Sequence, residues 1–217
     1  MAVTGTVARL GHVGIAVADL DRSVRFYTEV LGMRLTEMFD YGEGRAGHGV
    51  AVLSGAFVRG AEDTIHHRLS IFTLRDPEAP APGARTLGLH HIAFELDTQE
   101  DLVLMYQRFR SEEIPIVNAR IGGPGNHARF YGLDPDGNVL EFYWRIDQVG
   151  WSGAPHAYPP IQEVELDDFD FAEYERLRTS LDDDGWRELD AAALRASTRS
   201  GAGAGASAEH LDTGVTS

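Results

Sequence analysis

The stretch LGHVGIAVADLDRSVRFYTEVLGM, residues 10–33, has a counterpart further along the chain, LHHIAFELDTQEDLVLMYQRFRSEEI, residues 89–114. A shift of 79 positions, from 12 to 91, aligns the two stretches and places His12 on His91. Self-similarity at a fixed spacing is typical of a repeated supersecondary unit. The repeat therefore predicts two copies of one structural module, and it decides the fold.

Each copy opens with residues that alternate as a strand does. In the first copy one face would carry Val13, Ile15 and Val17, and the other His12, Gly14 and Ala16. His91, Ala93 and Glu95 repeat the second face in the second copy. A helix-capping residue follows each strand, Asp19 or Asp21 in the first copy and Thr98 in the second, so a helix is predicted next.

Three further strands are predicted after each helix. They cover about 33–41, 49–53 and 66–74 in the first copy, and 114–119, 128–133 and 138–145 in the second. Two βαβββ modules, at about 8–75 and 88–147, would each leave one sheet face uncovered and would pair to bury it. We therefore predict an α+β fold in which the two modules form one curved mixed sheet.

Composition excludes several function classes. The 217 residues are 43% hydrophobic and 24% charged, which is typical of a folded globular chain, and the net charge is -15. This charge repels phosphate backbones and anionic lipid, so we expect neither nucleic acid nor a membrane as partner. Cysteine is absent, so a metal would be held by His, Asp or Glu. No leader or membrane-spanning segment is evident, and we expect a cytoplasmic protein.

The last third of the chain has a different character. We expect residues 1–150 to form the main domain and 151–196 an acidic, partly helical extension. Residues 169–196 predict one or two amphipathic helices, interrupted near Asp184-Gly185, that pack on the main domain. The segment 197–217 is rich in Gly, Ala, Ser and Thr and lacks apolar periodicity, so we expect it to be disordered.

Three side chains indicate a metal centre. His12 and His91 occupy equivalent positions on two related strands, so both should point to the same side of the sheet. Glu141 lies on a later strand and shares a face with Val139 and Tyr143. Two imidazoles and one carboxylate are the ligands of non-haem Fe(II) oxygenases, which keep open positions on the metal. The alternative is that the histidines are hydrogen-bonded core residues and Glu141 lies at the sheet rim.

These features resemble the vicinal oxygen chelate superfamily, which includes glyoxalases, bleomycin resistance proteins and extradiol dioxygenases. Three stretches carry the resemblance: GHVGIAVADLDRSVRFYTEVLGM, LHHIAFEL and YGLDPDGNVLEFYW, together covering about residues 8–145. The resemblance implies paired βαβββ modules with a metal held inside the curved sheet. The superfamily also includes epimerases, thiol transferases and antibiotic-binding proteins, so the ligand positions must distinguish among activities.

The ligand positions favour the extradiol catechol dioxygenases. Lyase and isomerase members usually supply a fourth protein ligand at the first-module position that matches Glu141, and this position is Ser70 here. By resemblance, the second His of His66-His67 is the acid-base residue, and Tyr131 is the active-site tyrosine that precedes an Asp-Pro-x-Gly turn at 134–137. The resemblance thus implies metal ligands His12, His91 and Glu141, with His67 and Tyr131 as catalytic residues.

The implied reaction is ring cleavage of a catechol-type diol by O2, which gives a ring-opened semialdehyde. The implied cofactor is Fe(II), with Mn(II) as a substitute, and the implied partners are a small aromatic diol, O2 and further copies of the chain in a homodimer or larger oligomer. Two alternatives stay open. One is a metal-dependent lyase, isomerase or transferase that uses Zn, Mn or Ni, and the other is a non-catalytic protein that binds a small molecule.

One position departs from the extradiol pattern. Many of these enzymes have a further His nine positions before the tyrosine, where this chain has Gly122. His127 is nearby and would replace it as a third catalytic residue if the loop folds inward, and otherwise it would be exposed to solvent. His90 adjoins a proposed ligand, but alternation sends it to the opposite face, where we interpret it as structural.

Overall fold

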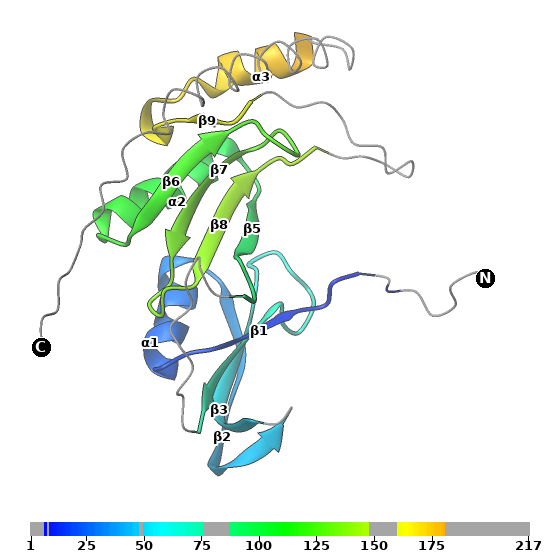
Figure 1. Ribbon diagram of the computed structural model, residues 1–217, viewed down its shortest axis with the longest axis vertical. Coiled ribbons are helices and arrows are strands. Elements are labelled where there is room, and N and C mark those ends of the chain that lie inside the picture. Colours follow the sequence, from blue (N-terminus) through cyan, green and yellow to red (C-terminus); the bar gives the residue numbers. More distant parts are fainter. Residues whose placement is uncertain (1–6, 8, 48–49, 76–86, 148–159, 181–217) are drawn as a thin grey trace, which may run out of the picture. The chain divides into compact units, whose positions relative to one another are not determined.

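The computed structural model describes residues 7, 9–47, 50–75, 87–147 and 160–180 (Figure 1). The first module contains β1 (Val13–Ala16), α1 (Leu20–Arg25), a π-helical turn η1 (Phe26–Val30), β2 (Arg34–Gly47), β3 (Val50–Arg59) and β4 (Leu69–Leu74). The second contains β5 (Ile92–Leu96), α2 (Gln99–Ser111), β6 (Ile116–Ile121), β7 (Ala128–Leu133) and β8 (Val139–Trp144). The predicted α+β fold with two βαβββ modules is confirmed, but the described strands form two mixed sheets instead of the single curved sheet that was predicted.

The two faces of β1 differ as the sequence predicts. Ile15 and Val17 are buried, whereas His12, Gly14 and Ala16 are exposed. Apolar side chains on one face of a strand bury that face, because this removes their surface from water. His12 consequently lies on the open face of its sheet.

Both helices begin at the predicted caps. The Asp19 side chain accepts a hydrogen bond from the backbone N–H of Arg22 at 2.9 Å. At the start of α2, Thr98 accepts from the N–H of Asp101 at 3.0 Å while Asp101 accepts from the N–H of Thr98 at 3.2 Å. These contacts satisfy backbone donors that a helix start leaves without partners.

The first module forms a four-stranded mixed sheet in the order β1-β4-β3-β2. β1 pairs parallel with β4, and the other neighbours are antiparallel. Ser70 on β4 lies beside Gly14 on one side and Phe57 on the other. Paired residues share a face of a sheet, so Ser70 and Phe57 lie on the face that carries His12.

Aromatic rings cover this face. Phe39, Phe57 and Phe72 have ring centroids 5.5 to 6.3 Å apart. Gly55 makes room for them, because a Cβ there would lie 2.5 Å from Cζ of Phe39 and 2.8 Å from the carbonyl oxygen of Ile71. A larger residue would displace the strand or the rings.

The strands of the first module differ in length from the predicted ones. β2 and β3 together are longer than 33–41 and 49–53, and β4 begins at Leu69 instead of residue 66. Register shifts interrupt the β2–β3 pairing between Leu35 and Glu37 and between Asp40 and Arg45. Bulges of this kind break the period of two, so a simple alternation rule ends the strands too early.

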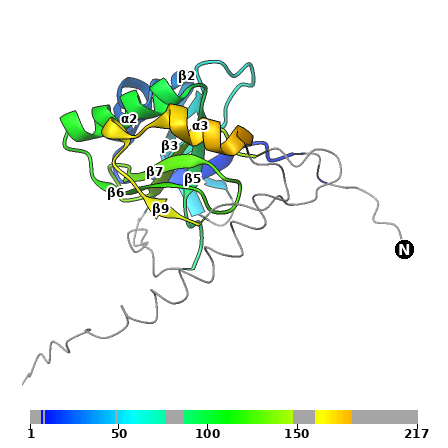
Figure 2. The ribbon, with the colours of Figure 1, turned by 90° about the horizontal axis from the view of Figure 1, so that it is seen from above.

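The second sheet has five strands in the order β5-β8-β7-β6-β9. α2 runs along this sheet (Figure 2). It packs on the sheet through Phe109, whose ring lies 5.3 Å from Phe130 on β7 and 5.2 Å from Phe142 on β8. All three rings are almost fully buried. This contact makes the core of the second module.

The chain divides into two compact units. The first comprises residues 1–94, 103–117 and 130–142, and it holds His12, His67, His91, Tyr131 and Glu141. The second comprises 95–102, 118–129 and 143–217, and it holds His127. Five of the six predicted site residues therefore belong to one unit.

In the described part of the C-terminal extension, the first element is β9 (Gln162–Glu163), which pairs antiparallel with β6. A short turn η2 (Leu166–Asp168) and a helix α3 (Phe171–Ser180) follow. Within the second unit, Phe171 packs on Trp144, and the hydroxyl of Tyr174 contacts the Asn126 side chain at 3.0 Å. The first part of the predicted helical segment is thus a helix, while residues 181–196 and the segment 197–217 lie outside the described residues. Among the described helices, none is long and apolar enough to span a membrane.

Candidate active site

The buried carboxylate of Glu141 is in contact with His91. Its Oε2 lies 2.9 Å from Nε2 of His91, and the two side chains are 7% and 32% exposed. A carboxylate removed from water needs a hydrogen-bond donor or a cation beside it. Glu141 lies on β8 and His91 immediately precedes β5, so the contact joins the opening and closing strands of the second module.

Two further rings surround His91. Tyr131 of β7 meets it edge to face with centroids 5.7 Å apart. The other ring nitrogen of His91, Nδ1, lies 2.7 Å from Nδ1 of His90. The expectation that alternation separates His90 from His91 is wrong, because β5 begins at Ile92 and strand geometry does not govern the two residues before it.

His67 and His12 form a second cluster in the same unit. Their ring centroids are 4.6 Å apart, and the ring of Phe57 lies 4.5 Å from that of His67. Burial lowers the pKa of the His67 imidazole, and His12 and His66 lower it further. His67 is consequently biased toward the neutral form, which can accept a proton.

His66 connects His67 to a carboxylate on β2. Nδ1 of His66 lies 3.0 Å from Nδ1 of His67, and its Nε2 lies 3.3 Å from Oε2 of Glu37. Glu37 pairs with Phe57 in the sheet, so all these groups lie over the same face of the first sheet. The adjacency of His66 and His67 was visible in the sequence, but the partner on β2 was not.

The Asp-Pro-x-Gly turn between Tyr131 and Glu141 is bound to the first helix. The hydroxyl of Tyr27 donates to Asp134 at 2.9 Å, and Asp136 accepts from Arg22 at 2.7 Å and from Ser23 at 3.2 Å. Burial and Asp134 strongly raise the pKa of Tyr27, which therefore stays protonated as a donor. Sequence reasoning missed these contacts, because only the fold brings the helix and the turn together.

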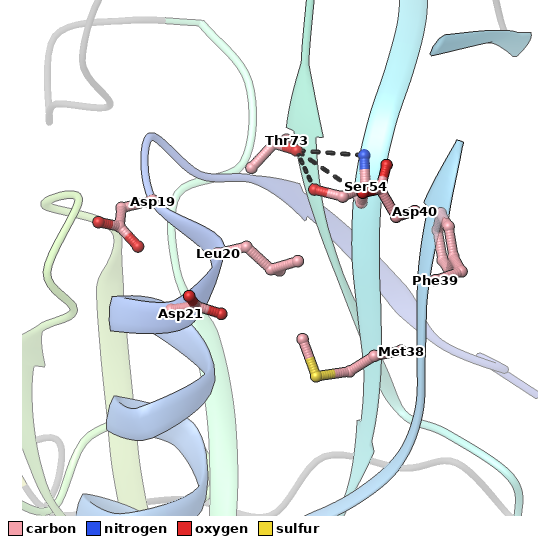
Figure 3. Close-up of a pocket in the computed structure, with 8 residues that line it drawn as sticks. All are labelled: Asp19, Leu20, Asp21, Met38, Phe39, Asp40, Ser54 and Thr73. Carbon is pink, nitrogen blue, oxygen red and sulfur yellow. Dashed lines mark hydrogen bonds between the residues drawn. The ribbon is translucent and has the colours of Figure 1, made fainter. Parts of the chain in front are cut away.

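A pocket of about 540 Å³ opens elsewhere in the first unit (Figure 3). It is lined by Asp19, Leu20, Asp21, Met38, Phe39, Asp40, Ser54 and Thr73. Ser54 and Thr73 are hydrogen-bonded to each other. They adjoin Gly55 and Phe72 along their strands, so their side chains point away from the face that carries His12. The residues that line the pocket include none of the six predicted site residues.

A family model described as the Glyoxalase/Bleomycin resistance protein/Dioxygenase superfamily matches residues 9–142. This chain belongs to that superfamily. The matched segment runs from just before β1 to Phe142 of β8, and so it covers both modules and every predicted ligand. The family suggested by the repeat and by its three signature stretches is confirmed.

Members of the superfamily that are similar to this chain have different activities in their names. The chain is 28% identical to 3-methylcatechol 2,3-dioxygenase of Pseudomonas putida over 141 residues, which are 64% of this chain and 43% of that enzyme. It is 30% identical to human mitochondrial methylmalonyl-CoA epimerase over 149 residues, or 64% of this chain and 76% of the epimerase. The chain therefore spans less than half the length of the dioxygenase.

A solved structure of a glyoxalase family protein from Bacillus cereus has the same fold. It matches this chain with a TM-score of 0.52 and 16% identity, covering 68% of this chain and all of the other. At this identity the likeness concerns the fold alone.

Superfamily members commonly bind a divalent metal, and the donors here fit one in part. His91 and Glu141 supply an imidazole and a buried carboxylate in direct contact, which are suitable ligands for a divalent ion. His12 contacts His67 instead. Among the residues that the structure describes, no three His, Asp or Glu side chains are grouped closely enough to hold a metal.

The loop that departs from the extradiol pattern has its own structure in the second unit. Gly122 has a φ of 74°, a conformation that favours glycine, and its carbonyl accepts from the buried Arg129 at 2.7 Å. His127 is only 7% exposed, and its ring meets that of Tyr143 at 5.6 Å. The solvent-exposed alternative for His127 is therefore wrong.

Proposed function

We propose that this chain is an Fe(II)-dependent extradiol dioxygenase that acts on a catechol-type diol. The observation that carries the proposal is the contact between buried Glu141 and His91 beside Tyr131. This supplies a carboxylate, one imidazole and a phenol from the positions that the extradiol resemblance assigns. The ligands in the proposal are His12, His91 and Glu141.

Ser70 supports an open metal site over a closed one. It is buried on the His12 face, where lyase and isomerase members usually carry a fourth ligand. A hydroxyl is a weak ligand for a divalent metal beside imidazole and carboxylate, so three protein ligands leave positions for other molecules. Fe(II) held by His12, His91 and Glu141 would supply the metal chemistry that brings the diol and O2 together.

The proposal requires His12 to leave His67 and join His91 and Glu141 when metal binds. The present contact between His12 and His67 involves two rings without an opposite charge to hold them. His12 precedes the first residue of β1 and is exposed, so it can move without breaking the strand pairing. Displacement of His12 would also open the space in front of His67.

Proton transfer in the proposed reaction falls to His67. A neutral imidazole accepts a hydroxyl proton from the diol and returns it as the ring opens, and both atoms of O2 enter the product. Tyr131 donates a hydrogen bond that orients a substrate oxygen. The rings of Phe39, Phe57 and Phe72 supply an apolar surface next to His67, which suits an aromatic substrate.

The test is oxygen uptake by protein reconstituted anaerobically with Fe(II) and given a panel of catechols, with absorbance of the ring-opened product followed in parallel. One O2 should disappear per product formed, and His67→Ala, His12→Ala and Glu141→Gln should each abolish turnover. Glu163→Gln, a change of an exposed carboxylate that contacts Arg120, is the control and should retain it. Iron binding without oxygen uptake on any catechol would overturn the proposal and direct attention to oxygen-independent metal chemistry.

A further inference from the structure

His66 has no role in the proposed reaction, yet it has two specific partners. Its Nε2 faces the carboxylate of Glu37 at 3.3 Å, and its Nδ1 faces Nδ1 of His67 at 3.0 Å. The ring of Phe57 contacts both imidazoles, with centroids 5.6 Å from His66 and 4.5 Å from His67. The contacts therefore run in one order, from Glu37 to His66 and from His66 to the candidate base His67.

Hydrogen-bond chemistry assigns a direction to this chain of contacts. An ionised carboxylate only accepts, so Nε2 of His66 must carry the hydrogen that faces Glu37. A neutral imidazole has one N–H, which leaves Nδ1 of His66 as an acceptor. Nδ1 of His67 then has to donate to it. The remaining nitrogen of His67, Nε2, is left with a free lone pair.

We propose that Glu37 and His66 are positioning residues that fix the tautomer and ring orientation of His67, so that its Nε2 is the basic atom presented to substrate. This inference deepens the proposed function and rests on it for its catalytic consequence. Neither Glu37 nor His66 would touch the substrate. Each acts through its neighbour, in the way that a second partner on a histidine nitrogen commonly sets which nitrogen is free.

The geometry separates this arrangement from a chance surface contact. Glu37 pairs with Phe57 across β2 and β3, so the sheet register sets the distance between the carboxylate and the ring that contacts both histidines. β4 begins at Leu69, and the histidines therefore lie in the turn that enters it. Glu37 and His66 are 58% and 50% exposed, so replacing either one removes their polar contact with little loss of core packing.

The direct test is the tautomer of His67 in the full-length metal-free protein, read from long-range 1H–15N NMR spectra of the imidazoles. The measurement is made about two pH units above the ordinary histidine pKa of about 6.5, where the rings are neutral. We expect His67 as the Nδ1–H form and His66 as the Nε2–H form. Assignment uses the signals that disappear in His66→Phe and in His67→Gln.

Two pairs of variants separate the hydrogen bond from the bulk of the side chain. His66→Phe keeps a ring beside Phe57 without an acceptor, whereas His66→Asn offers an amide oxygen near the position of Nδ1. Glu37→Ala removes the acceptor for His66, whereas Glu37→Gln keeps one. His67 should become a mixture of tautomers in His66→Phe and Glu37→Ala and should return to the Nδ1–H form in the other two. A wild-type His67 in the Nε2–H form, or one unaffected by His66→Phe, would overturn the inference.

Activity provides a second measurement that separates this inference from the proposed function. If the chain is a dioxygenase, kcat should fall about tenfold in His66→Phe and Glu37→Ala with KM nearly unchanged, and it should recover in His66→Asn and Glu37→Gln. If no catechol is turned over while the NMR pattern holds, the proposed function fails and the assignment of the tautomer stands. If turnover is found and the four variants all match wild type in kcat, the inference about Glu37 and His66 fails while the proposed function stands.

Discussion

The hydroxyl of Tyr27 donates a hydrogen bond to the carboxylate of Asp134 at 2.9 Å, although 107 positions separate the two residues in the chain. Tyr27 is completely buried in the first helical segment, and Asp134 begins the turn that leads to the strand of Glu141. Asp134 also accepts from the backbone N–H groups of Asp136 and Asn138. The turn is thus held both by its own backbone and by the other module.

Replacing Tyr27 with Phe should destabilise the protein. The change removes one donor from a buried carboxylate, and the expected loss in free energy of unfolding is about 1–3 kcal/mol. Urea denaturation followed by circular dichroism measures the shift in midpoint. Tyr41→Phe removes a hydroxyl from an exposed tyrosine and should change the midpoint by much less. Equal midpoints for the two variants would show that the bond to Asp134 contributes nothing.

The pKa of His67 should lie below the usual value for histidine in the metal-free protein. Burial is the main cause, and the nearby His12 and His66 add to it. His12→Ala should therefore raise this pKa, as measured by NMR titration of the His67 ring. His90→Asn changes a histidine that contacts His91 instead and should leave the pKa of His67 where it was.

The lowered pKa of His67 also has a consequence for stability. The unfolded chain binds a proton at His67 at a higher pH than the folded protein does, so stability falls as the pH drops through the unfolded value of about 6.5. Above that pH the imidazole is neutral in both the folded and the unfolded protein, so its protonation no longer affects stability. His67→Gln should flatten this part of the stability profile, measured by denaturation at several pH values. An unchanged slope between the variant and wild type would contradict the assignment to His67.

Placing at position 122 the histidine that many extradiol enzymes carry there should lower the stability of this protein and should not raise its catechol turnover. Gly122 has a φ of 74°, and a side chain with a Cβ is strained there by about 1–2 kcal/mol. Gly122→His should lower the melting temperature, while Gly122→Asn, a residue that tolerates this conformation better, should lower it less. A stable Gly122→His variant with faster catechol turnover would show that the loop adopts the extradiol arrangement after all.

Ser70→Glu should change the chemistry of the proposed metal site. Ser70 lies at the repeat position of Glu141 and is buried on the face of His12. A carboxylate there would supply a fourth ligand, close the open positions and abolish oxygen uptake while metal binding persists. Ser70→Gln adds the same bulk without the charge, so it controls for steric damage. Metal affinity is measured by titration with Co(II), and continued turnover by Ser70→Glu would contradict an open three-ligand site.

Much of the fold could be predicted from alternation and capping. β7 occupies the predicted residues 128–133, and the caps at Asp19 and Thr98 are where the sequence placed them. The long hairpin of β2 and β3 could not be predicted in full, because its bulges interrupt the period of two. The helical extension was anticipated, but its strand pairing with β6 was not, because β9 is only two residues long.

The candidate site, too, could be predicted from the sequence only in part. Strand alternation is a local property, so it could place His12 on the face of β1 opposite Ile15 and Val17, and Glu141 on the strand face of Val139 and Tyr143. It could not reveal that His91 contacts Glu141 while His12 contacts His67, because those distances depend on how separate strands pair and where turns aim their side chains. It also could not detect Glu37 behind His66, since only the sheet register brings residues 37 and 66 together.

The sequence by itself determined the repeat, the two modules, the family and the residue types available for chemistry, because each follows from local periodicity and from motifs read along the chain. Tertiary structure alone decided which of those residues meet. Hydrogen bonds such as that of Tyr27 to Asp134, and the buried charge of Glu141 with its need for a partner, act between residues that are distant in sequence. Their strength depends on distances that exist only once the chain has folded.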